Sequence, residues 1–331
     1  MTVSALYPLR FEPIYQYRPW GGRRLADWLD EPLPAEGPIG EAWLLSDRDE
    51  YPTCVAEGPL KGRTIAQLME HSSEMILGAL APRFDRFPLL LKLLDVSGML
   101  SVQVHPSDAA VDLIPKGDTG KTEAWVVLEA VAGSHIYAGL KPGTTRADLR
   151  ALSKQSVDEH LASFTPVCGQ SVLIEAGTVH ALGNGLVVFE VQENSDVTFR
   201  LYDWDRIDPR TGLCRALQVE QALACVDFAQ GAVQVAEPMP GISEPTTRKQ
   251  LLSCSHFHVW HVESAVPFFV GALNMPRILV CIKGKGQIEQ AGSNFAMRKG
   301  TVMLLPAAVG LCRFCPQDSV TLLEIGVPDS Q

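Results

Sequence analysis

Residues 101–105, with the sequence SVQVH, alternate strictly between polar and apolar side chains. Alternation with a period of two is typical of a β-strand that is buried on one face. Gln103 and His105 then share the polar face, with their Cα atoms about 7 Å apart. An amide oxygen and an imidazole nitrogen at this spacing can converge on one ion, so we interpret the stretch as half of a metal site.

Length and composition favour a large, β-rich protein. The 331 residues exceed one ordinary core, so we expect two domains. The 27 glycines and 23 prolines indicate many turns, and we expect mostly β-structure. The net charge of −10 argues against a nucleic-acid partner. A small anionic substrate stays compatible with this charge, because exposed charges fade over about 8–10 Å and cations inside a pocket dominate there.

Neither a signal sequence nor a membrane segment is expected. The first residues do not combine a basic start, an apolar run and a small-residue cleavage site, and the apolar runs near Leu89 and Val302 are short or interrupted by Pro306. The eight cysteines are spread through the chain, which favours reduced thiols over a disulfide framework. We therefore expect a cytoplasmic protein without a membrane partner.

The order of patterns along the chain predicts β-rich domains with a small helical part. Apolar spacing predicts helices over about residues 62–82 and 144–162. The Pro- and Gly-rich residues 230–249 form the predicted connector, which divides the chain into domains 1–235 and 236–331. Beyond it, regularly spaced short strands without helices, with turns predicted at residues 284–286 and 298–300, indicate a small antiparallel barrel or jelly roll.

Two charged patterns admit a functional and a plain interpretation. Lys92 interrupts the apolar residues 89–94, which predict a strand buried on both faces. A lysine there needs an anionic partner, unless its aliphatic stem carries the ammonium to the surface. Lys121 and Glu123 share one face of the next predicted strand, a pattern that is usually solvated surface. Their closeness to His105 in the sequence favours a role in the site.

Four side chains form the candidate metal site, and they are Gln103, His105, Glu123 and His180. Two imidazoles, a carboxylate and an amide oxygen are a mixed nitrogen and oxygen set that suits a divalent ion such as zinc. Adjacent strands of a barrel can bring such residues to one mouth. The spacing alone also allows His180 to be a turn histidine and Gln103 an ordinary strand residue.

Four motifs, in this order along the chain, resemble those of the type I mannose-6-phosphate isomerases, particularly their short bacterial form. They are residues 102–108 (VQVHPSD), 120–125 (GKTEAW), 175–183 (EAGTVHALG) and 190–200 (EVQENSDVTFR). The resemblance runs from residues 20–22 (WGG) to about Asp205 and is weaker beyond.

This resemblance implies a mainly β fold of two cupin-type jelly-roll barrels with a small helical part. It implies an enzyme that interconverts mannose 6-phosphate and fructose 6-phosphate through an enediol(ate), with one zinc per chain on the four candidate ligands. The family's catalytic arginine falls on Arg200, with Lys121 and Glu190 as further catalytic candidates. Its substrate contacts fall on Lys92, Ser101, Lys121 and Arg200. We expect a monomer or weak homodimer whose helical part is smaller than in the long members of the family.

Other functions are also compatible with a metal-binding cupin. They are a metal-dependent oxygenase, an isomerase of a different sugar phosphate, and a metal-stabilised sugar-binding or storage protein. Lysine and arginine side chains facing the site argue against an oxygenase of neutral substrates. An arginine beside the metal argues against a purely structural ion.

Two further patterns have plainer explanations. His256, His258 and His261 are the densest histidine cluster, but no carboxylate motif follows them as Glu123 follows His105. We expect these histidines in packing or on the surface rather than in a second metal site. Residues 312–315 form a lone CxxC whose two cysteines point to opposite faces of an extended strand, so we interpret them as structural.

Overall fold

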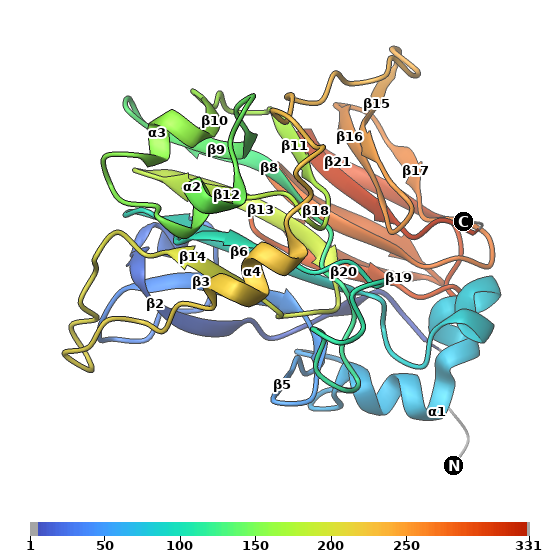
Figure 1. Cartoon of the computed structure of the whole chain (residues 1–331). Helices are drawn as coiled ribbons and strands as arrows, with labels where there is room; N and C mark the ends of the chain where they lie inside the picture. The colour runs from blue at the N-terminus through green and yellow to red at the C-terminus, as the bar shows by residue number, and fades with distance from the viewer. Residues whose placement is uncertain (1–5, 330–331) are drawn as a thin grey trace.

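The computed structural model describes residues 6–329. As predicted, the fold is mainly β: the described part holds three large antiparallel sheets and one two-stranded ribbon (Figure 1). The ribbon pairs β4 (Asp47–Arg48) with β5 (Tyr51–Pro52), and a short 3-10 helix, η1 (Arg24–Asp27), follows β2 (Ile14–Gly22). Within residues 6–329 the strand pairings do not close any of the sheets into a barrel.

The six-stranded sheet is the central layer. Its strands, in spatial order, are β11 (Ser171–Ile174), β8 (Glu123–Ala130), β13 (Leu186–Glu193), β6 (Leu89–Val96), β3 (Ile39–Leu45) and β2 (Ile14–Gly22). All of β6 is buried. Leu91 and Leu93 pack toward the C-terminal sheet, whereas Leu94 and Val96 pack toward the five-stranded sheet. The apolar run around Lys92 therefore reflects a strand covered on both faces, as predicted.

The five-stranded sheet lies against one face of this layer. Its strands, in spatial order, are β10 (Leu161–Phe164), β9 (His135–Leu140), β12 (His180–Gly183), β7 (Val102–Val104) and β14 (Phe199–Tyr202). Val102 and Val104 pack outward against α2 (Arg146–Arg150), α3 (Val157–His160) and α4 (Val219–Cys225). The polar side chains of residues 101–105 consequently point inward, as the alternation predicts. The expectation that only one face of this strand is buried is wrong, because Ser101, Gln103 and His105 are buried as well, between the two sheets.

The eight-stranded sheet contains the C-terminal strands. They are β15 (Thr246–Ser253), β16 (His258–Ser264), β17 (Phe268–Val270), β18 (Arg277–Gln290), β19 (Ser293–Arg298), β20 (Val302–Leu305) and β21 (Cys312–Gly326). The N-terminal β1 (Leu9–Arg10) pairs with β20 and completes this sheet. A turn predicted at residues 284–286 is wrong, because β18 continues through them. Gly284 adopts a φ of +77°, which permits a bulge instead of a chain reversal.

The helical part is small and differs in detail from the prediction. Residues 62–82 contain α1 (Ile65–Leu77), which starts with a capping box of Thr64 and Gln67, and most of the 3-10 helix η2 (Gly78–Arg83). The predicted helix over residues 144–162 is instead the two short helices α2 and α3. The Ser156 side chain accepts a hydrogen bond from the Ser153 amide between them, and such local bonds compete with helix continuation.

All eight cysteines are unpaired, as expected. Within residues 6–329, the structure has no helix with the length and apolar character needed to span a membrane.

Candidate active site and metal centre

Two rows of side chains line the space between the five-stranded and six-stranded sheets. Gln103 on β7 pairs with His180 on β12 and with Arg200 on β14. On the opposite sheet, Lys92 of β6 pairs with Glu190 of β13. Because directly paired residues of antiparallel strands point to the same face, each row presents its side chains together. Strand register thus brings together residues that are far apart in the sequence.

Three of the four predicted metal ligands converge at one end of these rows. His105, Glu123 and His180 are buried, and their ligand atoms lie within 4.8 Å of one another. The Nε2 atoms of His105 and His180 each lie 3.4 Å from a different carboxylate oxygen of Glu123. Two imidazole nitrogens and a carboxylate therefore face a common point, which is the donor set expected for a zinc-like ion.

Backbone carbonyls orient both imidazoles. Nδ1 of His105 lies 2.8 Å from the carbonyl oxygen of Val197, and Nδ1 of His180 lies 2.9 Å from that of Thr178. Each Nδ1–H donates to its carbonyl, so each Nε2 presents a lone pair to the carboxylate. Burial lowers the pKa of both histidines, and with the charge of Lys121 it brings the pKa of His105 to about 3. The neutral imidazole is the form that binds metals.

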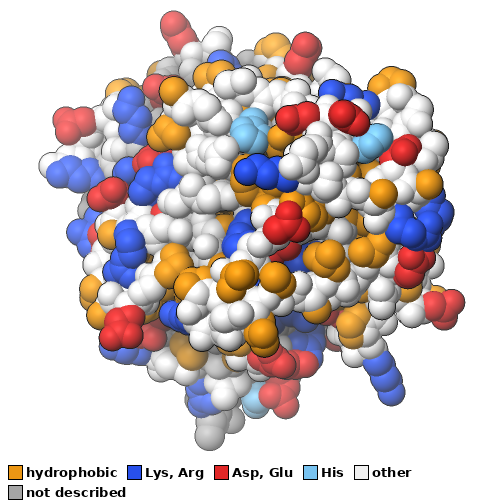
Figure 2. Space-filling view, turned by 60° about the vertical axis from the view of Figure 1, so that its left-hand side comes forward, with side chains coloured by type: hydrophobic (Ala, Val, Ile, Leu, Met, Phe, Trp, Pro, Cys, Tyr) orange, Lys and Arg blue, Asp and Glu red, His pale blue; other side chains and the backbone are white. Residues whose placement is uncertain are grey.

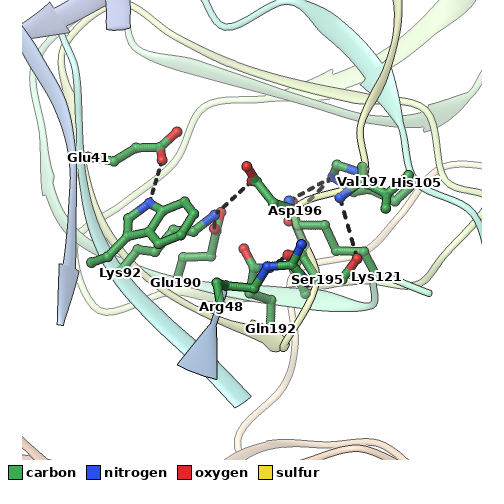
Figure 3. A network of polar contacts seen from close by, with 12 residues as sticks. Glu41, Arg48, Lys92, His105, Lys121, Glu190, Gln192, Ser195, Asp196 and Val197 are labelled. Carbon is green, nitrogen blue, oxygen red and sulfur yellow. Dashed lines mark hydrogen bonds and ion pairs between the residues drawn. The ribbon is translucent and has the colours of Figure 1, made fainter. Parts of the chain in front are cut away.

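Lys121 extends over the same donor group (Figure 3). Its Nζ lies 2.7 Å from Oε2 of Glu123 and 3.2 Å from Nε2 of His105. Although burial raises the pKa of Glu123, the charge of Lys121 outweighs it and holds this pKa well below the usual range. A fully buried carboxylate needs such cationic compensation. The buried carboxylate and the two Nε2 lone pairs, which accept from Lys121 and Gln103, form a donor set that fits a divalent cation.

Gln103 lies beside this group with its amide nitrogen toward it. Nε2 of Gln103 is 3.2 Å from Nε2 of His180, and its Oε1 accepts a hydrogen bond of 3.0 Å from Oγ of Ser101. A ligand role through the oxygen requires the amide to turn by 180°, which exchanges two atoms of similar size. Ser101 thus contacts Gln103 and lies behind it, outside the lining of the neighbouring cavity.

A cavity of about 380 Å³ adjoins the metal-ligand group. Its cationic lining consists of Arg18, Lys92, Lys121, Arg200 and Arg215, and its acidic lining consists of Glu41, Glu190, Asp196 and Asp208. The surface in Figure 2 carries basic and acidic side chains interspersed, and the cavity lining also mixes both signs, with five cations against four carboxylates. The cavity therefore suits a small anion in a protein of net negative charge.

Lys92 has the anionic partner that its burial demands (Figure 3). Its Nζ lies 3.1 Å from Oε1 of Glu190 and 4.0 Å from Asp196. Burial disfavours the ammonium, but these carboxylates more than compensate and raise the pKa of Lys92. Burial and the nearby charge of Glu123 raise the pKa of Glu190, whose Oε2 accepts a hydrogen bond of 3.0 Å from Trp125. The interpretation of Lys92 as a surface lysine is excluded.

Arg200 lies at the cavity with an uncommitted donor. Its Nε is buried and has no hydrogen-bond partner among the described residues. Burial and the nearby charge of Arg215 lower the pKa of Arg200. A buried guanidinium N–H without a partner is costly, so this donor is available to a ligand in the cavity.

A second ion pair in the lining was missed in the sequence. Arg18 donates to both carboxylate oxygens of Glu41 at 2.9 and 3.0 Å, and Nε1 of Trp43 donates to the same carboxylate at 2.8 Å. Burial opposes ionisation, but Arg18 and Lys92 lower the pKa of Glu41 to about 2. Glu41 interrupts a buried apolar strand as Lys92 does, and that shared pattern was the available signal.

The C-terminal histidines do not form a joint site. His258 and His261 lie on β16, whereas Nδ1 of His256 lies 3.3 Å from Glu193. Within residues 6–329, the three histidines do not appear together in any group of converging ligand atoms. His256 joins Asp108 and Glu193 in a second group of converging ligand atoms, at the end of β13.

Comparisons with known proteins agree with this geometry. Residues 9–121 match the family model described as phosphomannose isomerase type I, catalytic domain. The chain is 32% identical over 307 residues to mannose-6-phosphate isomerase ManA of Bacillus subtilis, covering 92% of this chain and 94% of that protein. It is 32% identical over 311 residues to mannose-6-phosphate isomerase of Streptococcus mutans, covering 93% and 95%.

Solved structures show the same relationship. The crystal structure of the mannose 6-phosphate isomerase from Bacillus subtilis superposes with a TM-score of 0.88 at 27% identity, covering 97% of this chain and 99% of that one. A variant of phosphomannose isomerase from Salmonella typhimurium shares the fold, with a TM-score of 0.79 at 15% identity and coverage of 97% and 100%. On the strength of relatives 32% identical over more than nine-tenths of its length, the chain belongs to the type I mannose-6-phosphate isomerase family.

Proposed function

We propose that this protein is a zinc-dependent aldose–ketose isomerase that interconverts mannose 6-phosphate and fructose 6-phosphate through an enediol(ate). The observation that carries the proposal is the convergence of His105, Glu123 and His180 beside a cavity lined by five cations. The donor group provides for a metal, and the cations provide for a phosphate ester. Membership of the isomerase family supports the choice of substrate.

The metal would be held by Gln103, His105, Glu123 and His180. When bound, zinc supplies Lewis-acid stabilisation of negative charge on a substrate oxygen. The buried carboxylate and the two oriented imidazoles support this assignment. The turned amide of Gln103 would supply the fourth ligand atom.

The chain's own cations would bind the substrate and stabilise its developing charge. Moving a proton between C1 and C2 of a hexose phosphate builds negative charge on an enediolate oxygen. Arg200 would donate its free Nε–H toward that charge, and a donor prepared in advance stabilises the transition state. Lys92 and Lys121 would hold the remaining anionic oxygens, with Ser101 supporting the site through Gln103.

Glu190 is the strongest candidate among the three proposed catalytic residues for carrying the proton. Its pKa is raised by burial and by Glu123, and a general acid or base works best when its pKa lies closer to the working pH. Lys92, 3.1 Å away, would stabilise its ionised form after the proton has moved. Lys121 would act beside it, between the metal ligands and the cavity.

We extend the proposal to the architecture and setting of the enzyme. The five-stranded and six-stranded sheets would form one cupin-type jelly roll and the C-terminal strands a second, with the domain boundary between residues 235 and 236. The enzyme would act in the cytoplasm as a monomer or weak homodimer. Size measurement in solution would test the oligomeric state.

The direct test is a coupled assay that follows fructose 6-phosphate formed from mannose 6-phosphate. We expect turnover by the zinc-loaded protein, loss of turnover after complete treatment with a chelator, and recovery when zinc is restored. Full turnover by demonstrably metal-free protein would contradict the metal assignment. Absence of turnover by zinc-loaded protein, with turnover of another sugar phosphate, would contradict the substrate assignment.

A further inference from the structure

The peptide before Glu123 is held in place by side chains from outside the metal-ligand group. The amide of Gly120 donates to Oδ1 of Asp108 at 2.7 Å. A Cβ on Gly120 would lie 2.5 Å from the backbone nitrogen of Asp108, so only glycine permits this close approach. The turn that follows His105 is thereby joined to the start of β8.

A second carboxylate holds the amide on the other side of Lys121. The amide of Thr122 donates to Oε2 of Glu193 at 2.6 Å, and the amide of Glu193 donates to the carbonyl of Thr122 at 3.1 Å. Glu193 is 7% exposed, and its other oxygen lies 3.3 Å from Nδ1 of His256. A residue from the segment between β15 and β16 therefore contacts the carboxylate that holds Thr122.

Lys121 thus lies between Gly120 and Thr122, two residues whose backbone amides donate hydrogen bonds to carboxylates. Its own amide donates to the carbonyl of Pro106 at 3.0 Å, so three consecutive peptide N–H groups are fixed. Its ammonium lies against Glu123 and His105, where small displacements change both contacts. A misplacement of about 1 Å at a catalytic group can cost about 10²-fold in rate.

We propose that Asp108 and Glu193 are positioning residues for the isomerisation, holding Lys121 and Glu123 in register with the metal-ligand group. His256 contacts the second oxygen of Glu193, so a residue from the C-terminal part of the chain contributes to this positioning. The inference rests on the proposed function for its kinetic consequence. The hydrogen bonds of the Gly120 and Thr122 amides can be tested without reference to isomerase activity.

The first test compares truncating and conservative variants of the zinc-loaded enzyme. Glu193→Ala and Asp108→Ala remove the acceptor, whereas Glu193→Gln and Asp108→Asn keep a carbonyl oxygen for the same amide. We expect each Ala variant to lower kcat about 10–100-fold, as is typical for groups that orient a metal site. Each conservative variant should recover most of that loss. Ala variants with the parent's kcat, or conservative variants as impaired as the Ala variants, would overturn the proposal.

Asp47 offers a matched control. It is also buried, and its Oδ2 accepts a hydrogen bond of 2.7 Å from the amide of Phe87, which is not part of the peptide that precedes Glu123. Asp47→Ala should lower the thermal midpoint much as Glu193→Ala does, while its kcat stays near that of the parent. An equal loss of kcat in Asp47→Ala would show that the loss of kcat in Glu193→Ala results from general destabilisation.

Amide hydrogen exchange supplies a readout that does not depend on activity. In Glu193→Ala the Thr122 amide should exchange faster than in the parent, and in Asp108→Ala the Gly120 amide should do so. Unchanged exchange in both variants would overturn the positioning role. If the parent lacked mannose-6-phosphate isomerase activity, the proposed function would fail. The positioning role would still be supported if the amides exchanged faster in the Ala variants and at the parent's rate in the Gln and Asn variants.

Discussion

Glu123 and Glu324 are both buried carboxylates on β-strands, yet their surroundings give them different chemistry. Glu123 faces the Nε2 atoms of two neutral imidazoles and the ammonium of Lys121. Both imidazoles have their protons committed to backbone carbonyls, so lone pairs remain at the centre of the group. This arrangement holds donors that a metal ion can use.

Glu324, on β21 of the C-terminal sheet, is surrounded by cations instead. Its two oxygens lie 2.9 Å from Arg248 and 3.7 Å from Arg277, and both guanidinium groups lie over the ring of Trp260. Arginine offers donors and no lone pair. The two guanidinium groups compensate the negative charge of Glu324 and add no acceptor atom that could bind a cation with it. A buried carboxylate therefore suggests a metal site where its neighbours include further acceptors, as at Glu123.

The largest expected effect is the loss of the metal from the first environment. Glu123→Ala or His180→Ala should reduce the zinc content from about one per chain. A bound metal stabilises negative charge in the transition state by several kcal/mol. Its loss should therefore lower kcat by about 10³-fold or more. Metal analysis and the coupled assay on the same samples would measure both effects. Full zinc stoichiometry in both variants would refute the ligand assignment.

Arg200→Lys should produce the next largest effect. The lysine keeps a charge but lacks the planar set of donors, so the loss should appear mainly in kcat, about 10²–10³-fold as for removal of one such donor. Zinc content and thermal midpoint should match those of the parent. A raised KM with a near-normal kcat would limit Arg200 to substrate binding, and loss of zinc would make it a structural residue.

Local pattern was enough to predict the strands that position the site. The apolar run around Lys92 reflects a strand covered on both faces. The alternation in residues 101–105 separates the two faces of β7, although the polar face is buried too, because it lines a site between two sheets. The helix predicted over residues 144–162 was only partly right, because residues 151–156 separate the short helices α2 and α3. Apolar spacing does not register local side-chain bonds such as that from the Ser153 amide to Ser156 in this gap. The turn at residues 284–286 was wrong because glycine serves bulges and turns alike.

The site was predictable as a set of residue types but not as a set of contacts. Gln103, His180 and Arg200 become neighbours through the pairing of three strands, and register between distant strands cannot be read from spacing. The resemblance to known isomerases supplied that information. Arg18 and Glu41 were overlooked because they lie outside the quoted motifs, on two strands, β2 and β3, whose pairing was unknown.

Glu324→Ala should affect stability rather than catalysis. Removing one member of a buried ionic group leaves the arginines without their partner, which costs about 3 kcal/mol in the free energy of unfolding. Urea denaturation should show this loss, while kcat per folded molecule stays within about twofold of the parent, a change under about 0.4 kcal/mol. A variant with normal stability and a large loss of kcat would show that the C-terminal ion cluster takes part in the reaction.

The smallest effect is expected from replacing His256, His258 and His261 together with alanine. Zinc content should stay at that of the parent, because these histidines do not converge with one another in the part of the chain that the structure describes. A modest fall in kcat is expected through His256, smaller than that of Glu193→Ala, since Glu193 keeps its bond to the Thr122 amide. The double variant His258→Ala with His261→Ala, which leaves His256 intact, should retain the parent's kcat. If the double variant lost zinc while remaining folded, the metal would have to bind in the C-terminal sheet, and the contrast between Glu123 and Glu324 would fail.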